Sequence, residues 1–389
     1  MTQIPAGLQA SIADFIQIRR DIHAHPELGL KEFRTSDLVA ARLTEWGYQV
    51  TRGLAETGIV AQLKRGQGSK RLGLRADMDA LPIVEQTGLS YASCHHGVMH
   101  ACGHDGHTAM LLAAAWYLVE QGRFDGTLNL IFQPAEEHPG GAQIMIEQGL
   151  FERFPCDAVY AMHNMPGHPV GHLLLRDGPT MASSDDVTIT ITGQGGHGAM
   201  PHQATDCVVA ASSLVMALQT IVARNVPPLK TAVVTVGSFV AGQANNVIPV
   251  SARLELSVRA LDREVRDLLQ QRITALAQAQ AEGYGCQARV DYRRDYPVLV
   301  NTQAETDLAR EVALGLVGAD RVTLQAEPLT GSEDFAFMLD HCPGSYLMIG
   351  NGAGEGSCMV HNPGYDFNDD NLATGAAFWV ALTERFLQD

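Results

Sequence analysis

The spacing of apolar residues divides the chain into segments with helical and with strand-like periodicity. Two apolar stripes at helical spacing, 12–22 and 38–46, predict a pair of amphipathic helices within residues 6–48. The Ala- and Leu-rich run at 109–115 predicts a buried helix. Short segments rich in apolar residues predict strands at 59–63, 71–75, 127–132 and 158–162. This alternation of strands and helices predicts an α/β domain with a mainly parallel sheet and flanking helices.

The periodicity changes after residue 182. Residues 186–192 alternate strictly between apolar and polar, which is typical of a strand with one solvent-facing side. Related patterns predict further strands at 232–240, 252–259 and 288–292, and helices at 204–223 and 263–282. Because the first pattern then resumes, we expect a small α+β sandwich, residues 183–293, inserted into a domain formed by residues 1–182 and 294–389.

Length, charge and cysteine usage narrow the class of protein. A chain of 389 residues exceeds the usual size of a single hydrophobic core, and its formal charge of −16 disfavours nucleic acid or an anionic membrane as partner. The first residues lack the pattern of a signal peptide, and no apolar run is long enough to span a bilayer. Seven scattered cysteines without a CxxC pair fit free thiols in a reducing compartment. We therefore expect a cytoplasmic protein with no nucleic-acid or membrane partner.

The largest cluster of potential metal ligands lies between His100 and His107, where the sequence reads HACGHDGH. Three histidines, one cysteine and one aspartate precede the helix expected at 109–115, so we expect them in a loop that leads into its first turn. The thiolate of Cys102 and the imidazole of His104 suit a borderline-soft divalent metal such as Zn²⁺. The alternative is a helix start that is rich in histidine by chance.

Acidic residues and a histidine follow three of the expected strands. Asp79 comes shortly after the strand at 71–75, either as a ligand or, as we favour, as a carboxylate that orients a ligand histidine. Glu136 and Glu137 follow the strand at 127–132, and His163 ends the strand at 158–162. Parallel strands deliver these residues to one edge of the sheet, where paired glutamates suit one metal ligand and one general base.

Other histidines were weighed against this cluster. His23 and His25 lie near a predicted helix end, and the segment 94–96, Cys-His-His, lies in a polar loop; we expect neither to bind metal. His361 precedes the terminal helix and is a candidate ligand from the far end of the chain. His197 lies in a glycine-rich loop that lacks the GK[ST] ending of a phosphate-binding loop.

Six motifs in the same order resemble the M20 metallopeptidase family, in particular its aminoacylase and hippurate-hydrolase branch, which includes plant auxin-conjugate hydrolases. The resemblance covers essentially the whole chain. The motifs lie at 19–27, 73–81, 100–107, 133–137, 195–197 and 332–335. It implies two divalent metal ions per subunit, with Zn²⁺ the first expectation and Mn²⁺, Co²⁺ or Ni²⁺ as alternatives. It also implies that the inserted domain serves as a lid and forms a homodimer.

The resemblance assigns roles to individual residues. Cys102 would bridge the two metals. Glu137 and His361 would complete one metal site, and His104 and His163 the other. The general base would be Glu136, and the histidine matching His197 would reach the metals of the partner subunit to stabilise an oxyanion.

The implied reaction is hydrolysis of an N-acyl amino acid to a carboxylate and a free amino acid. An aminopeptidase or dipeptidase of the same fold is the alternative enzyme. A non-catalytic metal-binding or interaction protein is a further alternative, against which the presence of Glu136 beside a ligand argues. Arg259 and Asn245 are expected to hold the substrate carboxylate, although Arg259 could equally form an ordinary surface ion pair.

Overall fold

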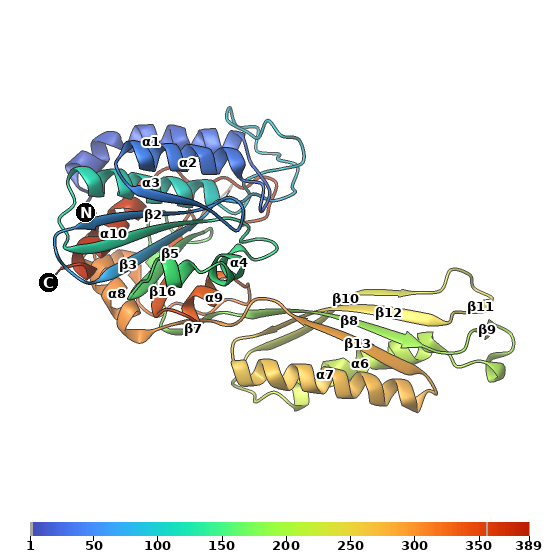
Figure 1. The fold of residues 1–389 in the computed structure, drawn as a ribbon. Coiled ribbons are helices and arrows are strands. Elements are labelled where there is room, and N and C mark those ends of the chain that lie inside the picture. The colour runs from blue at the N-terminus through green and yellow to red at the C-terminus, as the bar shows by residue number, and fades with distance from the viewer. Residues whose placement is uncertain (1–2, 355–356, 389) are drawn as a thin grey trace. The chain divides into compact units, whose positions relative to one another are not determined.

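The computed structural model describes residues 3–354 and 357–388, which divide into two compact units (Figure 1). The first contains the chain up to Gly178, Val300–Glu327 and the chain from Asp334 onward. The second contains Pro179–Leu299 and Pro328–Glu333. The boundaries expected from the sequence, 183 and 293, lie a few residues away from these.

The segment Pro328–Glu333 was expected in the larger domain, but the structure places it in the second unit. Its backbone supplies the reason. The N–H of Leu329 donates to the carbonyl of Thr180 at 2.9 Å, and the N–H of Ala182 lies 3.0 Å from the carbonyl of Leu329 and 2.9 Å from that of Gly331. Hydrogen bonds between segments so distant in sequence leave no signal in local periodicity.

The first unit is built on an eight-stranded mixed sheet with the strand order β1-β2-β4-β3-β5-β16-β6-β15. The central strands β4, β3, β5 and β16 run parallel to one another, and antiparallel pairs lie toward the edges. The mainly parallel α/β architecture expected from the sequence is thereby confirmed. The strands are β1 Gln49–Leu54, β2 Gly58–Arg65, β3 Arg71–Asp77, β4 Gly126–Gln133, β5 Ala158–Met165, β6 Leu173–Leu174, β15 Val322–Thr323 and β16 Gly344–Gly350.

Helices cover both faces of this sheet. Helices α1, α2, α3, α8 and α10 share one hydrophobic core with strand residues such as Leu130 and Phe132, whereas the buried Ile131 between them points to the other face. Helices α4 and α9 pack on each other and on the sheet. The helices are α1 Ala6–Ala24, α2 Phe33–Glu45, α3 His104–Glu120, α4 Gly141–Glu147, α5 Leu150–Arg153, α8 Gln303–Val317, α9 Phe335–Leu339 and α10 Asn371–Phe386, with the 3-10 turn η2 Ala319–Arg321.

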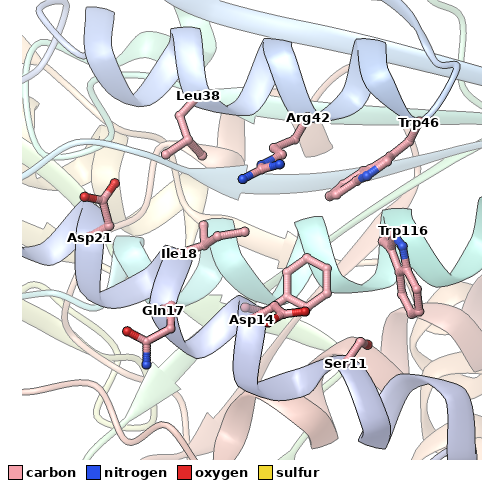
Figure 2. A pocket seen from close by; sticks show the side chains of 10 residues that line it. Ser11, Asp14, Gln17, Ile18, Asp21, Leu38, Arg42, Trp46 and Trp116 are labelled. Atoms are coloured by element: carbon pink, nitrogen blue, oxygen red, sulfur yellow. The ribbon is translucent and has the colours of Figure 1, made fainter.

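An aromatic cluster joins α1, α2 and α3 at the surface. Phe15 of α1 is buried, and its ring centre lies 6.1 Å from that of Trp46 and 6.2 Å from that of Trp116. Figure 2 shows these helices around an open groove of about 530 Å³, which Trp46 and Trp116 line at one end. Two of the three tryptophans in the chain therefore report on the packing of these helices.

The second unit has a four-stranded antiparallel sheet with the order β10-β12-β8-β13, together with two long helices. Val187, Ile189 and Ile191 of β8 point into its core, as the strict alternation predicted. Its elements are β8 Ser183–Thr192, β9 Gly196–His197, η1 Pro201–Gln203, α6 Cys207–Arg224, β10 Ala232–Ala241, β11 Val247–Ile248, β12 Ser251–Ala260, α7 Arg263–Gly283 and β13 Gln287–Arg294. A further two-stranded ladder joins β7 Gly178–Met181 and β14 Leu299–Asn301.

Helix α6 is, within the part of the chain that the structure describes, the one helix long and apolar enough to cross a membrane by length and composition. No such segment was expected from the sequence. The helix begins at a cap in which Asp206 accepts hydrogen bonds from Val208 and Val209. Leu214, Leu218 and other residues of one face are buried against α7 and the sheet. This arrangement is that of an amphipathic helix packed on a domain core.

Candidate metal centre

The metal-binding candidates gather at the carboxyl ends of β4 and β5 and at the start of α3. His104 is the first residue of α3, so the histidine-rich segment lies in the first turn of the helix and not wholly in a loop before it. Gly103 precedes it with φ +92°, and a Cβ there would lie 2.2 Å from Nδ2 of Asn164. Only glycine fits this turn, which places Cys102 and His104 on the two sides of one bend.

The five residues expected as ligands fall into two groups that share Cys102. In the first group, ligand atoms of Cys102, His104 and His163 all lie within 4.8 Å of one another. In the second group, those of Cys102, Glu137 and His361 meet the same limit. The Cys102 Sγ lies 3.3 Å from Nε2 of His163, and Nε2 of His361 lies 3.0 Å from Oε1 of Glu137. One thiol therefore stands between two sets of ligands.

His104 carries the clearest sign that this centre suits a cation. Its Nδ1 lies 3.1 Å from Oδ1 of Asp79, whereas its buried Nε2 has no hydrogen-bond partner among the described residues. Burial would lower the pKa of His104, but the carboxylates of Asp77 and Asp79 outweigh this and raise the pKa to about 10. A metal ion on Nε2 would take the place of this costly buried proton, so the site fits a divalent ion.

Asp79 also supports the second group of ligands. Its Oδ2 accepts a hydrogen bond from the backbone N–H of Glu137 at 3.0 Å, while Oδ1 contacts His104. One carboxylate thus holds a residue from each group, which is the arrangement that orients metal ligands.

The pKa shifts of the ligand side chains bear on how they would bind a metal. Burial lowers the pKa of His163, which keeps its imidazole neutral. Burial would raise the pKa of Glu137, but its contact with His361 and the charge of His104 lower it, which keeps the carboxylate ionised. Burial and then the charges of Glu137 and Glu136 raise the pKa of the Cys102 thiol, so a cation is needed to hold it as a thiolate.

His107 lies beside these ligands but is fully occupied by hydrogen bonds. Its Nδ1 lies 2.6 Å from Oδ1 of Asp77, and its Nε2 accepts the backbone N–H of Asn164 at 3.0 Å. Because both ring nitrogens have partners, His107 serves to hold the turn and is not an open ligand.

Glu136 lies at the same centre and belongs to neither of the groups that share Cys102. It is 6% exposed, and its Oε2 lies 4.0 Å from Nε2 of His104. The preceding Ala135 has φ +54°, and its N–H donates to Oε1 of the buried Glu32 at 2.9 Å. This backbone conformation places the side chains of Glu136 and Glu137 in different surroundings.

Sequence reasoning missed Asn164, which joins two parts of the centre. Its Nδ2 donates to the carbonyl of Cys102 at 2.6 Å, and its backbone N–H holds His107. The signal was a polar residue directly after His163 at the end of a buried strand. His23, weighed earlier as a ligand, instead lies 2.9 Å from Asp105 and 3.3 Å from Glu85.

Three further candidates belong to the second unit. His197 of β9 is exposed, and its Nδ1 accepts the backbone N–H of Ala199 at 3.1 Å. Arg259 of β12 donates to the hydroxyls of Ser332 at 2.8 Å and Ser257 at 3.3 Å. Asn245 is exposed in the loop between β10 and β11.

Comparisons with known proteins agree with this geometry. Residues 73–385 match the model of peptidase family M20/M25/M40. The chain is 45% identical to a hippurate hydrolase of Campylobacter jejuni over 388 residues, covering 100% of both chains. It is 40% identical to an N-acetyl-L-cysteine deacetylase of Bacillus subtilis, covering 98% of this chain and 90% of that one. A dinuclear metal-binding M20 peptidase from Bacillus subtilis superposes with a TM-score of 0.85 at 33% identity, covering 97% of this chain and 99% of that one.

Proposed function

This chain belongs to peptidase family M20/M25/M40 and is a hydrolase of amide bonds, and we propose that it cleaves N-acyl amino acids to a carboxylate and a free amino acid. The relatives named as hippurate hydrolase and N-acetyl-L-cysteine deacetylase support this substrate class. The observation that carries the proposal is the position of Cys102 in both ligand groups, with the carboxylate of Glu136 beside them.

We propose that Cys102, His104 and His163 hold one divalent ion and that Cys102, Glu137 and His361 hold the other. The mixed thiolate, imidazole and carboxylate donors favour Zn²⁺, with Mn²⁺, Co²⁺ or Ni²⁺ as alternatives. Two such ions supply Lewis acidity to the acyl carbonyl and lower the pKa of a bound water. Asp79 orients His104 and Glu137 through the contacts described above.

Glu136 is proposed as the general base. Its Oε2 lies 4.0 Å from Nε2 of His104, whereas its neighbour Glu137 forms the group with Cys102 and His361. A carboxylate in this place can take the proton of the attacking water and pass it to the leaving amine.

His197 is proposed as the donor to the developing oxyanion, acting in the partner subunit. The N–H of Ala199 donates to its Nδ1, so the neutral ring must carry its hydrogen on the exposed Nε2. That tautomer is the one that can donate a hydrogen bond to negative charge.

Arg259, with Asn245, is proposed to bind the substrate carboxylate. The hydrogen bonds described for Arg259 go to two neutral hydroxyl groups, so its charge is not already neutralised by these partners. A guanidinium in this state can pair with a carboxylate.

We propose a homodimer formed by the second unit. Strand β10 is an edge strand of the antiparallel sheet. Phe239, Val240 and, nearby, Val247 and Val250 are exposed there, beside an open groove of about 910 Å³. An apolar edge of this kind is a surface that a second copy would cover. Free thiols at all seven cysteines support a reducing compartment, and we propose the cytoplasm.

The decisive experiment compares hydrolysis of hippurate, N-acetyl amino acids and free dipeptides, with metal removed and then restored. We expect metal-dependent release of the amino acid from N-acyl substrates. Turnover of dipeptides alone would identify an aminopeptidase or dipeptidase, and no turnover of any amide would overturn the proposal. For Arg259→Ala, KM should rise for N-acyl amino acids far more than for the corresponding amides.

A further inference from the structure

Histidine and cysteine side chains also gather outside the candidate metal centre, where the loop between β3 and α3 meets the end of α1 (Figure 1). The backbone N–H of Cys94 donates to the carbonyl of Ala24 at 2.9 Å, and its Sγ lies 2.8 Å from the same oxygen. Nδ1 of His95 donates to the carbonyl of Pro26 at 3.2 Å. These contacts carry His95 to the side of His25, which follows the last residue of α1.

The hydrogen bonds of His25 and His95 determine which ring nitrogen of each can bind a metal ion. Nδ1 of His25 lies 2.8 Å from the carbonyl oxygen of Asp21, and Nδ1 of His95 contacts that of Pro26. A carbonyl oxygen only accepts, so each Nδ1 carries the hydrogen and each neutral ring leaves a lone pair on Nε2. A backbone carbonyl on one ring nitrogen is the support that metal-binding histidines usually have.

The two rings lie close enough to share one ion. Their centres are 6.0 Å apart, and their planes are inclined by 81°. Two imidazoles on one tetrahedral ion would place their centres roughly 5 Å apart, by the usual Zn–N distance. The difference is within the reach of small side-chain rotations at an exposed surface, since His25 is 35% exposed and His95 is more open still.

The carboxylate of Asp21, which also pairs with Arg34 at 2.8 Å, supports the first imidazole from the side of Nδ1. Its Oδ1 lies 3.5 Å from Nδ1 of His25. The remaining coordination positions face solvent and can be taken by water.

We propose that His25 and His95 bind a divalent transition-metal ion of the Zn²⁺ class through their Nε2 atoms. This site is separate from the dinuclear centre and does not depend on the proposed function. It differs from the expectation from sequence that neither His25 nor the 94–96 segment binds metal. A bound ion would tie the β3–α3 loop to the end of α1.

The test measures Zn²⁺ stoichiometry and affinity by equilibrium dialysis of the metal-loaded protein. Wild type should bind one equivalent more than His25→Ala or His95→Ala, whatever number the dinuclear centre holds. Each variant should weaken this equivalent at least tenfold, and the double variant no further than either single one. His96→Ala, which removes the neighbouring exposed histidine, is the matched control and should retain the equivalent.

Equal Zn²⁺ binding by wild type, His25→Ala and His95→Ala would overturn the proposal. Loss of the same equivalent in His96→Ala would also overturn it, because the ion would then bind the loop without this geometry. Cys94→Ser should keep the additional Zn²⁺ equivalent. If only Cys94→Ser lost it, the ligand would be the thiol and not the pair of imidazoles, and the proposal would be overturned. The metal-free variants should unfold at the same temperature as the metal-free wild type, which excludes misfolding as the cause of lost Zn²⁺ binding.

Discussion

At the scale of single residues, the candidate centre depends on one thiol shared by two ligand groups. Cys102→Ser should weaken both metals together, because a serine hydroxyl stays protonated at neutral pH and cannot bridge as a thiolate does. Elemental analysis of the purified variant should show loss of most of the metal. The half-buried Cys156, changed to serine, is the control and should keep its full metal content.

Glu136 and Glu137 are adjacent in sequence, but we expect the first to serve catalysis and the second to bind metal. Glu136→Gln keeps the size of the side chain but cannot accept a proton, so kcat should fall by about 10²–10⁴-fold with metal content unchanged. Glu137→Gln should instead lose metal. A Glu136→Gln enzyme with more than a tenth of the wild-type kcat would remove Glu136 from the role of base.

Glu32 gives the fold a pH dependence of its own. It is fully buried, and this burial raises its pKa to about 7, despite hydrogen bonds from Thr57 and Ala135. The unfolded carboxyl titrates near its ordinary pKa of 4.5, so between these two pKa values the folded chain binds the proton more strongly. Stability therefore falls as the pH rises through this window, by up to about 3 kcal/mol.

Glu32→Gln removes this titration while keeping an amide that can bond Thr57 and Ala135. Relative to wild type, the variant should gain stability from about pH 4.5 to pH 7, the interval between the two pKa values, and the gain should level off above it. Urea unfolding at several pH values measures the difference. A difference in the free energy of unfolding that does not change with pH would show that Glu32 stays ionised in the folded chain.

Much of the site was predictable from residues at the ends of strands, because parallel topology brings those ends together. Asp79, Glu136 and His163 could be read in this way from local patterns alone. Asn164 could not, since its bond to the carbonyl of Cys102 spans 62 residues. A hydrogen bond of this length is decided by the packed fold and leaves only a weak trace in sequence.

At the scale of secondary structure elements, the strongly periodic segments were predicted and the weakly periodic ones were missed. The buried strands β2 to β5 and helices α1, α2, α6 and α7 follow apolar runs or stripes in the sequence. Strand β1 was missed because its pattern is mostly polar and it pairs only at an edge of the sheet. The start of α3 was placed too late, because two polar histidines, His104 and His107, and Asp105 conceal its first turns.

Phe15 should be a critical contact between α1, α2 and α3. It is 3% exposed, and Phe15→Ala should cost about 3–5 kcal/mol because the cavity between three helices cannot close fully. Water reaching Trp46 and Trp116 should also shift the tryptophan emission to the red, whereas Trp379 is buried elsewhere, in α10. Denaturant unfolding and fluorescence measure the two effects.

Phe33→Ala is the matched control for this substitution. Phe33 begins α2 but is 57% exposed, so its removal should change stability by no more than about 0.5 kcal/mol and leave the emission unchanged. Similar losses in both variants would show that general apolar content, and not the contact between the helices, determines the result.

At the scale of the whole molecule, the sequence predicted two domains because the periodicity changes near residue 182. It could not place the segment Pro328–Glu333, which joins the second unit through backbone hydrogen bonds to a strand more than a hundred residues earlier. The same kind of limit applies to the proposed homodimer. Local patterns reveal an exposed edge strand, but they do not identify the surface that covers it.

The role of His197 is the property that only the assembled molecule can test. Its Nδ1 accepts the N–H of Ala199, which leaves Nε2 to donate, and in the proposed dimer it would serve the metals of the partner subunit. His197→Ala and Glu136→Gln should each be nearly inactive alone. If the two variants are mixed under conditions in which subunits exchange, a heterodimer has one centre with both groups intact.

Activity should therefore return in the mixture, toward a quarter of the wild-type value when subunits mix at random, since half of the dimers are then mixed and each has one of two centres complete. The measurement is hydrolysis of an N-acyl amino acid, followed as the exchange proceeds. Mixing two samples of the same variant is the control and should restore nothing. If His197 acted on the metals of its own chain, every centre in the mixture would lack one group and the mixture would remain inactive.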